Sequence, residues 1–338
     1  MTGANHSAGY ASLTPFGVIS LLLAAIVLAV APLVAPAQSY PARPVKLIVP
    51  FAAGGTTDAV GRFLAQYLGE RLGQSVVVEN RPGGGGTVGA NAAARSPADG
   101  YTLLMGSAES FGLTPSEAKR LPYNPERELV PIVMVVRAPN VFAVHPSLPV
   151  RSIQELIAVA RAHPGKLHYG TPGVGTNVHL IGELFKHRYR IDLVHVPYKG
   201  GGAAITDAVS GQIEVLVSGV VTIAPRAQAG QIRALAVTGS SRAPIMPGVP
   251  TMKEAGVDDC VLGPLFGLFA PAGTPAAARE RVARDAIAAS RTPELRKRYA
   301  DVGMEEVEPL TGDAFGRFMR SEVQRWREMA AVAGIKED

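Results

Sequence analysis

Cysteine and several familiar catalytic patterns are nearly or wholly missing from this sequence. Cys260 is the single cysteine among 338 residues, so no disulfide can form within the chain. The histidines form neither an H-E-x-x-H pattern nor a dense cluster with Asp and Glu, so nothing supports a metal site. There is no G-x-x-x-x-G-K-[ST] loop and no G-x-S-x-G elbow. We therefore expect a protein that is not an enzyme and has no cofactor and no metal.

Charged side chains are missing from the first 42 residues, which contain no Asp, Glu, Lys or Arg. Within them Phe16–Val34 is almost continuously apolar, and Ala35-Pro-Ala37 supplies the small residues that a signal peptidase reads. The pattern predicts a signal peptide at residues 1–37, cleavage after Ala37 and an exported protein. An uncleaved membrane anchor is the competing interpretation, because the apolar run nearly reaches the length that spans a bilayer.

The composition predicts a folded protein with a small partner. Hydrophobic residues make up 47% of the chain, enough to build the cores of about two domains, and charged residues make up 18%. The net charge is +5, but Lys and Arg do not cluster with aromatic residues, so we expect no nucleic acid as a partner. A small anionic ligand agrees with this charge.

Apolar runs and helical periodicities alternate along the chain after the leader, which predicts an α/β fold with helices covering parallel strands. The predicted strands are Lys46–Phe51, Val76–Glu79, Thr102–Met105, Ile132–Val136, Val141–Val144, Leu167–Tyr169, Leu193–Val196, Ile213–Val217, Arg233–Val237 and Leu265–Ala270. The predicted helices are Thr57–Leu72, about Thr87–Arg95, one capped by Ser152, one after Asn177, one near Ala203–Ser210, Pro275–Ser290, Pro293–Val302 and Asp313–Ala331.

The last helices have no strands of their own, so we expect them to cover the first sheet. The chain would then cross twice between two lobes, near Asn140–His145 and near Gly263–Phe269, and two crossings make a hinge. We predict lobe 1 from residues 38–141 plus 266–338 and lobe 2 from residues 142–265.

Two stretches have the order strand, glycine turn, helix: Phe51-Ala-Ala-Gly-Gly-Thr-Thr-Asp58 and Thr171-Pro-Gly-Val-Gly-Thr-Asn177. Glycine lets the backbone approach a ligand, and a helix start directs N–H groups toward it, so each turn can hold a carboxylate or a phosphate. Micromolar binding of a small acid requires about 8 kcal/mol. Charge-assisted hydrogen bonds contribute about 1.5–3 kcal/mol each, so we predict that both turns clamp one ligand. The predicted ligand-binding residues are Phe51, Ala53, Gly54, Gly55, Thr56, Asp58, Gly173, Gly175, Thr176 and Asn177, with Asp58 acting chiefly as a helix cap.

Polar residues after other strands are further candidates. Glu109 and Ser110 follow a buried strand, where the cleft residues of an α/β sheet fall. Ser107 is a predicted ligand residue, whereas Glu109 is unusual beside an anion and either points away or meets a ligand cation. Tyr198 and Lys199 also follow a strand and are predicted to aim a hydroxyl and an ammonium group at the cleft. The alternative for this pair is a solvated turn.

The glycine-rich stretch Gly84-Gly-Gly-Thr-Val-Gly89 matches the G-x-G-x-x-G pattern of dinucleotide sites. It follows the second strand instead of the first, and no acidic residue lies near the expected ribose position about 20 residues further on. We therefore expect a structural turn there.

A set of short motifs resembles the Bug family of extracytoplasmic solute receptors, the binding component of tripartite tricarboxylate transporters. The resemblance covers the whole mature chain. Its motifs are Ile48-Val-Pro-Phe-Ala-Ala-Gly-Gly-Thr-Thr-Asp58, Val78-Glu-Asn-Arg-Pro-Gly83, Asp99-Gly-Tyr-Thr-Leu103, Pro164-Gly-Lys-Leu167, His195-Val-Pro-Tyr-Lys-Gly200, Leu235-Ala-Val-Thr238, Pro247-Gly-Val-Pro250 and Phe266-Gly-Leu-Phe-Ala-Pro-Ala-Gly-Thr-Pro275.

The resemblance implies a two-lobed periplasmic-binding-protein fold of the Venus flytrap type (type II), with two mixed or parallel sheets and a hinge. It implies that the Phe51–Asp58 loop holds a ligand carboxylate, partly through ordered water, and that the Gly173–Asn177 turn grips the ligand from the second lobe. It implies a monomer that delivers a small carboxylate to membrane permease subunits. Many members have an acidic residue and Asn where this chain has Ser218-Gly219, and Trp where it has Leu265. An amino-acid ligand is therefore less expected, because the acidic partner for its ammonium group is missing.

Three other functions stay open from the sequence. A sensor could use the same receptor to report its ligand to a signalling kinase. An exported α/β enzyme would need a nucleophile–base pair or a metal cluster. A binding module for a phosphate ester would use the same helix starts.

Overall fold

The computed structural model describes residues 40–257 and 263–333. The predicted signal peptide and Cys260 lie outside these residues. None of the helices in the described ranges is both long and apolar enough to cross a membrane.

Six strands form the first sheet, in the order β11-β4-β10-β3-β1-β2. The strands β1, β2 and β3 run parallel, whereas β10 pairs antiparallel with both β3 and β4, and β11 pairs antiparallel with β4. Apolar runs produce these strands: β3 and β10 are buried along their whole lengths. The bounds are β1 Val45–Val49, β2 Val76–Asn80, β3 Thr102–Gly106, β4 Leu129–Arg137, β10 Leu265–Pro271 and β11 Glu305–Glu306.

Five strands form the second sheet, in the order β7-β6-β8-β5-β9. The strands β6, β7 and β8 are parallel, and β5 is antiparallel to β8 and β9. The bounds are β5 Asn140–Val144, β6 Leu167–Thr171, β7 Leu193–Pro197, β8 Val215–Gly219 and β9 Arg233–Val237. Two mixed sheets thus confirm the predicted α/β fold class.

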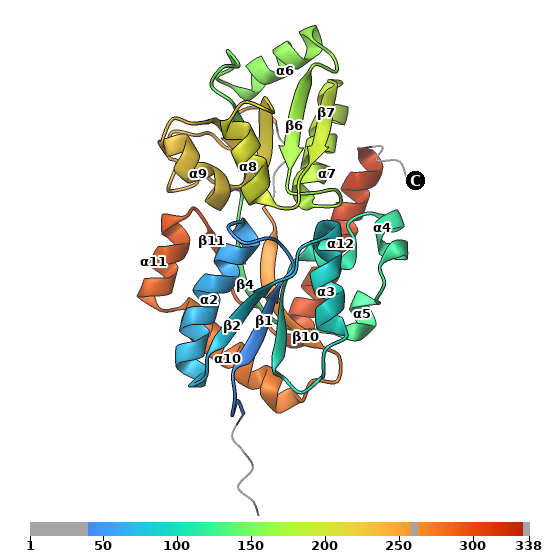
Figure 1. The fold of residues 1–338 in the computed structure, drawn as a ribbon, viewed down its shortest axis with the longest axis vertical. Coiled ribbons are helices and arrows are strands. Elements are labelled where there is room, and N and C mark those ends of the chain that lie inside the picture. The colour runs from blue at the N-terminus through green and yellow to red at the C-terminus, as the bar shows by residue number, and fades with distance from the viewer. Residues whose placement is uncertain (1–39, 258–262, 334–338) are drawn as a thin grey trace, which may run out of the picture. The chain divides into compact units, whose positions relative to one another are not determined.

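Helices surround both sheets (Figure 1). Those predicted from periodicity are present, whereas α4, α5 and α9 were not predicted. The interior Pro225 hides the helical pattern of α9, since proline usually ends a helix. The bounds are α2 Thr56–Leu72, α3 Thr87–Ala94, α4 Pro115–Arg120, α5 Pro125–Glu128, α6 Ile153–Ala162, α7 Asn177–Tyr189, α8 Gly201–Val209, α9 Val220–Gln228, α10 Ala276–Ser290, α11 Pro293–Asp301 and α12 Gly312–Val332, with short 3-10 helices η1 Gly84–Gly86 and η2 Ala108–Phe111.

The chain changes sheet at two places in the described residues. It leaves the first sheet after Arg137 and enters the second at Asn140, so the change precedes the predicted crossing near Asn140–His145. It returns to the first sheet with β10, which begins at Leu265. Lobe boundaries at residues 141 and 265 stay a proposal.

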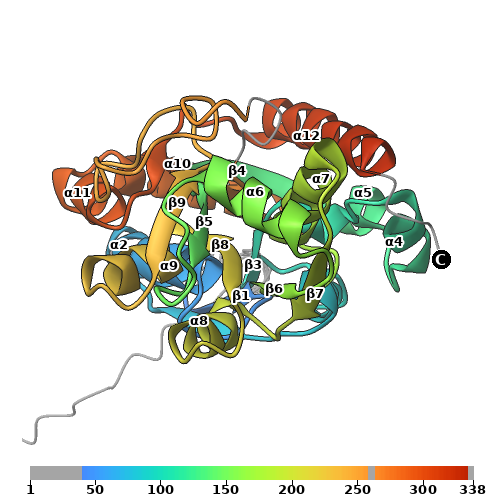
Figure 2. The ribbon, with the colours of Figure 1, turned by 90° about the horizontal axis from the view of Figure 1, so that it is seen from above.

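The last helix, α12, packs on β4 and also contacts α7 beside the second sheet (Figures 1 and 2). Its buried stripe contains Phe315 and Trp326, which belong to one apolar cluster with Phe142 of β5 and Leu180 of α7. The Arg327 guanidinium donates to the carbonyl oxygens of η2 and the residue after it. The helix expected to cover the first sheet therefore also ties that sheet to α7.

Candidate functional site

A small cavity lies where loops from the two sheets meet. Its volume is about 50 Å³, and it collects the starts of four helices, namely α2, α7, α8 and α9. Larger hollows exist, but they lie elsewhere: one of about 960 Å³ runs along the surface of α10. The cavity is lined by Phe51, Gly55, Thr56, Thr57, Glu109, Asn140, Pro172, Thr176, Asn177, Val178, Gly201, Ser218, Gly219, Thr222, Pro264 and Phe266.

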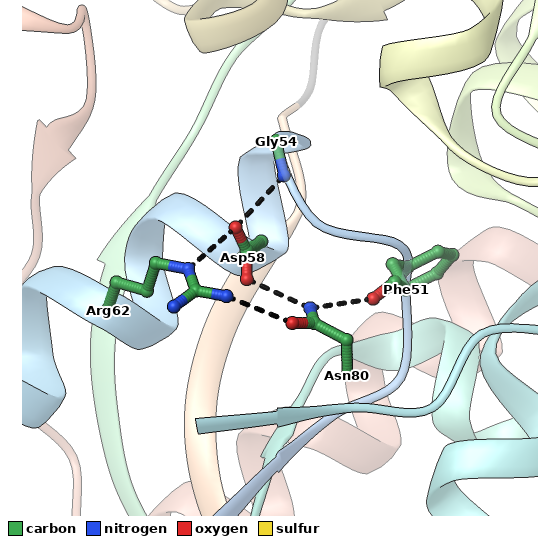
Figure 3. A network of polar contacts seen from close by, with 5 residues as sticks. All are labelled: Phe51, Gly54, Asp58, Arg62 and Asn80. Carbon is green, nitrogen blue, oxygen red and sulfur yellow. Dashed lines mark hydrogen bonds and ion pairs between the residues drawn. The ribbon is translucent and has the colours of Figure 1, made fainter. Parts of the chain in front are cut away.

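A charged network supports the loop between β1 and α2 (Figure 3). One oxygen of Asp58 accepts hydrogen bonds from Gly54 N and from Arg62 Nε, both at 2.9 Å. The other oxygen accepts from Asn80 Nδ2 at 2.9 Å, and the same amide nitrogen donates to the Phe51 carbonyl. The network holds both ends of the loop, and Gly54 has a φ of 83°, a backbone conformation that favours glycine.

Burial by itself disfavours the charged form of Asp58, but the hydrogen bonds from Arg62, Gly54 and Asn80 outweigh it and lower the pKa of the carboxyl. Asp58 is therefore the ionised centre of the loop support (Figure 3). Gly55, Thr56 and Thr57, at the start of α2, line the cavity.

The turn before α7 is fixed by hydroxyl groups. Thr176 is the N-cap of α7, because its Oγ1 accepts from His179 N and donates to the Gly173 carbonyl at 2.7 Å. Thr171 donates toward the same carbonyl, and its Oγ1 lies 2.7 Å from His195 Nε2. The turn is thus a pre-formed support for the start of the helix.

Two histidine rings stack behind this turn. The rings of His179 and His195 lie 4.4 Å apart, and Tyr169 stacks on the other side of His195 at 4.8 Å. Burial, helped by the neighbouring His179, lowers the pKa of His195 to about 4, and burial also lowers the pKa of His179. Both rings are therefore neutral at physiological pH, and they act as packing and hydrogen-bonding groups.

Glu109 joins the two sheets across the cavity. It lies on η2, after β3 of the first sheet, and its Oε1 accepts from Asn177 N at 2.9 Å and from Asn177 Nδ2 at 2.6 Å. Ser107 Oγ donates to Oε2 at 2.9 Å, and Asn140 Nδ2 donates to Asn177 Oδ1 at 2.6 Å. The first N–H group of α7, that of Asn177, is therefore already hydrogen-bonded to the Glu109 carboxylate.

The other side of the cavity is formed by the starts of α8 and α9. A Cβ placed at Gly219 would overlap Thr56 Oγ1 and lie 3.0 Å from Thr56 Cβ, so only glycine allows the α2 start to come this close. Thr222 is 8% exposed, and its Oγ1 has no hydrogen-bond partner in the described part of the chain. A buried hydroxyl without a partner is unfavourable, so this group is available to a ligand.

Comparison with known proteins agrees with this architecture. The sequence pattern of the tripartite tricarboxylate transporter family receptor, TctC, matches residues 60–335. The chain belongs to this receptor family. It is 36% identical to Protein BugT of Bordetella pertussis over 323 residues, which are 94% of this chain and 98% of that protein.

Two solved structures have the same fold and are 32% and 33% identical to this chain in sequence. The periplasmic binding protein BugD superposes with a TM-score of 0.83 at 32% identity, covering 88% of this chain and 99% of that one. The R. palustris protein Rpa4515, solved with adipate, superposes with a TM-score of 0.82 at 33% identity, covering 87% and 98%. The Bug-type assignment and the two-lobed periplasmic-binding-protein fold are thereby confirmed.

The structure places five of the predicted site residues on the cavity of this TctC-family receptor: Phe51, Gly55, Thr56, Thr176 and Asn177. The others contribute differently. Asp58 supports the loop, Ser107 donates to Glu109, and Ala53, Gly54 and Lys199 are exposed. Gly173 and Gly175 shape the turn before α7.

The Tyr198 hydroxyl donates to Asp207 at 2.8 Å. Burial and this carboxylate raise the pKa of Tyr198 to about 12. Ligand contact by Tyr198, Lys199, Ala53 and Gly54 stays a prediction.

Sequence reasoning gave no role to Asn140, Gly201 or Thr222, which all line the cavity. Asn140 could have been predicted as a site residue, because it is a polar residue at the start of an otherwise apolar strand. Thr222 could not, since the helix that carries it was not predicted. Glu109 was placed in the cleft region, but its bond to Asn177 was not foreseen.

Proposed function

We propose that this protein is a periplasmic receptor that captures a small organic carboxylate between its two lobes and delivers it to the permease subunits of a tripartite tricarboxylate-type transporter. One observation carries the proposal: helix starts from both sheets line one cavity. Helix starts present N–H groups and a partial positive charge, which suit a carboxylate. Family membership and the adipate in Rpa4515 support the same class of ligand.

The proposed grip has two sides. On the first, the N–H groups of Gly55, Thr56 and Thr57 at the start of α2 would bind the carboxylate, on a loop whose shape is held by Asp58. On the second, Ser218 and Thr222 offer hydroxyls beside the starts of α8 and α9. Backbone groups at Ala53 and Gly54, with Gly175 and Thr176 opposite, complete the proposed grip as the lobes close.

The wider proposal follows the sequence. Removal of residues 1–37 would release the mature protein into the periplasm, where it would act as a monomer. The strand connections at Ala138–Pro139 and before Leu265 would serve as the hinge. No catalytic step is proposed.

Ligand binding can be tested by thermal unfolding of the mature protein with mono-, di- and tricarboxylates, amino acids and phosphates. A ligand at about a hundred times its dissociation constant stabilises the folded state by about 2.7 kcal/mol. Thr222→Val keeps the side-chain shape but removes the hydroxyl, so it should weaken binding of the best carboxylate several-fold without lowering stability. Thr206→Val, the same change on the exposed face of α8, is the control. Stabilisation by phosphates alone would contradict the carboxylate assignment.

Delivery to a permease requires a separate test. Cells that contain the permease but lack this receptor should take up the identified carboxylate only when the receptor gene is restored. Normal uptake without the receptor would contradict the transport part of the proposal and leave sensing as the alternative.

A further inference from the structure

Glu109 is a buried carboxylate inside a site that is proposed to bind carboxylates. Its side chain lies among Ser107, Asn140 and Asn177, and these four residues are 8%, 3%, 2% and 6% exposed. Both of its oxygens accept hydrogen bonds, and Asn177 donates from its backbone and from its side chain. The bonds cross from the first sheet to the second, so the carboxylate position is set by both lobes together.

The place that Glu109 occupies is the one that a second ligand anion would use. Asn177 is the first residue of α7, and its N–H is one of the donors that a helix start offers to an anion. Here Glu109 accepts that N–H at 2.9 Å. Asn140 orients the Asn177 amide by donating to its oxygen, which turns the amide nitrogen toward Glu109. The start of α7 is therefore already neutralised by the protein.

The cavity has no positive side chain with which to compensate another negative charge. Its lining in the described residues contains no Lys, Arg or His, and Glu109 is the acidic residue among them. A ligand carboxylate held at the start of α2 lies across a small cavity from Glu109. A second ligand carboxylate at the start of α7 would have to approach Glu109 itself, and like charges repel strongly away from water.

The groups left for the rest of the ligand are hydroxyls and the starts of α8 and α9, and none of them carries a full charge. Thr222 Oγ1 is buried without a hydrogen-bond partner in the described chain, and Ser218 lies beside it. Hydroxyls can bind an uncharged polar group or an ammonium group, and Glu109 favours a positive end over a negative one.

We infer that Glu109 restricts this receptor to ligands that carry one carboxylate only, by filling the anion position at the start of α7. The inference rests on the proposed function, since it concerns the second end of a ligand whose first end is bound as a carboxylate. It makes Glu109 a specificity-determining residue, and it places dicarboxylates outside the preferred ligands of this chain.

The test compares ligands of equal length that differ at one end. Butyrate, 4-aminobutyrate and succinate form one set, and hexanoate, 6-aminohexanoate and adipate form another. Dissociation constants are measured by calorimetry for the mature protein and for Glu109→Gln. Glutamine can keep the bonds to Asn177 and Ser107 while removing the charge. Glu109→Asp keeps the charge, and Glu70→Gln removes an equal charge from an exposed site on α2.

In the unsubstituted protein, a ligand with one carboxylate should bind at least about tenfold more tightly than the matched dicarboxylate. Glu109→Gln should reduce that preference at least about tenfold by strengthening dicarboxylate binding, whereas Glu109→Asp and Glu70→Gln should preserve it. The inference is wrong if the unsubstituted protein prefers the dicarboxylate or if Glu109→Gln leaves the preference unchanged. If no carboxylate of any length binds to the folded protein, the proposed function itself is wrong. Thermal unfolding without ligand checks that each variant is folded.

Discussion

Replacing Gly219 by alanine should obstruct closure of the receptor while leaving each lobe intact. Gly219 has φ −65° and ψ 148°, which alanine adopts without strain. The new Cβ would overlap Thr56 Oγ1, and it would lie 3.0 Å from Thr56 Cβ and 3.4 Å from Thr56 Cγ2. Rotation of the Thr56 side chain can remove the first overlap, but it cannot move Thr56 Cβ, which is fixed by the first turn of α2. The lobes must therefore separate slightly.

The size of the effect follows from the cost of overpacking, which is about 1–3 kcal/mol. If this acts only on the closed form, Gly219→Ala should weaken binding of the best carboxylate by about 5- to 150-fold. Calorimetry measures the affinity, and urea unfolding without ligand should show little loss of stability.

Gly202→Ala is the matched control. It lies on the first turn of α8 against the same loop, but its Cβ would be 3.5 Å from the Ala53 carbonyl, an ordinary contact. Thr56→Ala in the Gly219→Ala background removes the overlapping hydroxyl and should restore part of the affinity, as a double-mutant cycle would show. Wild-type affinity in Gly219→Ala would refute the view that binding requires this close approach of Gly219 to Thr56.

Three further changes test the supports of the site. Asp58→Asn removes the charge that Arg62 and Gly54 stabilise, so it should lower the free energy of unfolding, measured with urea, by about 1.5–3 kcal/mol. The control is Asp301→Asn, which removes a charge from an exposed ion pair and should change that free energy by about 0.5 kcal/mol or less. The pKa of His195 in the folded protein is about 4, below its ordinary value, so the folded protein binds fewer protons than the unfolded chain between these two values. Its stability should therefore fall as the pH drops from about 6.5 to about 4. His195→Gln should flatten that profile, and an unchanged profile would contradict the burial argument. Trp326→Ala should lower the unfolding free energy by about 3–5 kcal/mol, and a loss below about 1 kcal/mol would show that α12 is not part of the joint core.

The parts of the site that lie within one strand–turn–helix unit could be predicted from the sequence. Phe51, Gly55 and Thr56 follow one another along the chain, so glycine chemistry and helix periodicity were enough to place them at a helix start. Thr176 could be predicted as a cap for the same reason. The strands were predictable because apolar runs of about five residues between turns are typical of buried strands.

The parts that depend on contacts between distant segments could not be predicted. Glu109 and Asn177 are 68 residues apart, and no sequence pattern near either residue predicts the hydrogen bond between them. The contact of α12 with α7 is of the same kind, since the apolar stripe of α12 shows that it is buried but not against what. Tyr198 follows a strand as a cleft residue would, yet its hydroxyl donates to Asp207, nine residues further along the chain.

The contacts around Glu109 also explain why its position is fixed even though a short 3-10 helix carries it. Arg327 of α12 donates to the carbonyl oxygens of Phe111 and Gly112 at the end of η2, and α12 packs against α7, which presents Asn177. The helix that holds the donor and the segment that holds the acceptor are thus both packed on α12. If the lobes open as proposed, the Glu109–Asn177 bonds must break, but water then replaces them, so each bond adds only about 1.5–3 kcal/mol to the closed form. A ligand that binds both lobes needs to add only a few kcal/mol of preference for closure, which hydrogen bonds to one carboxylate can provide.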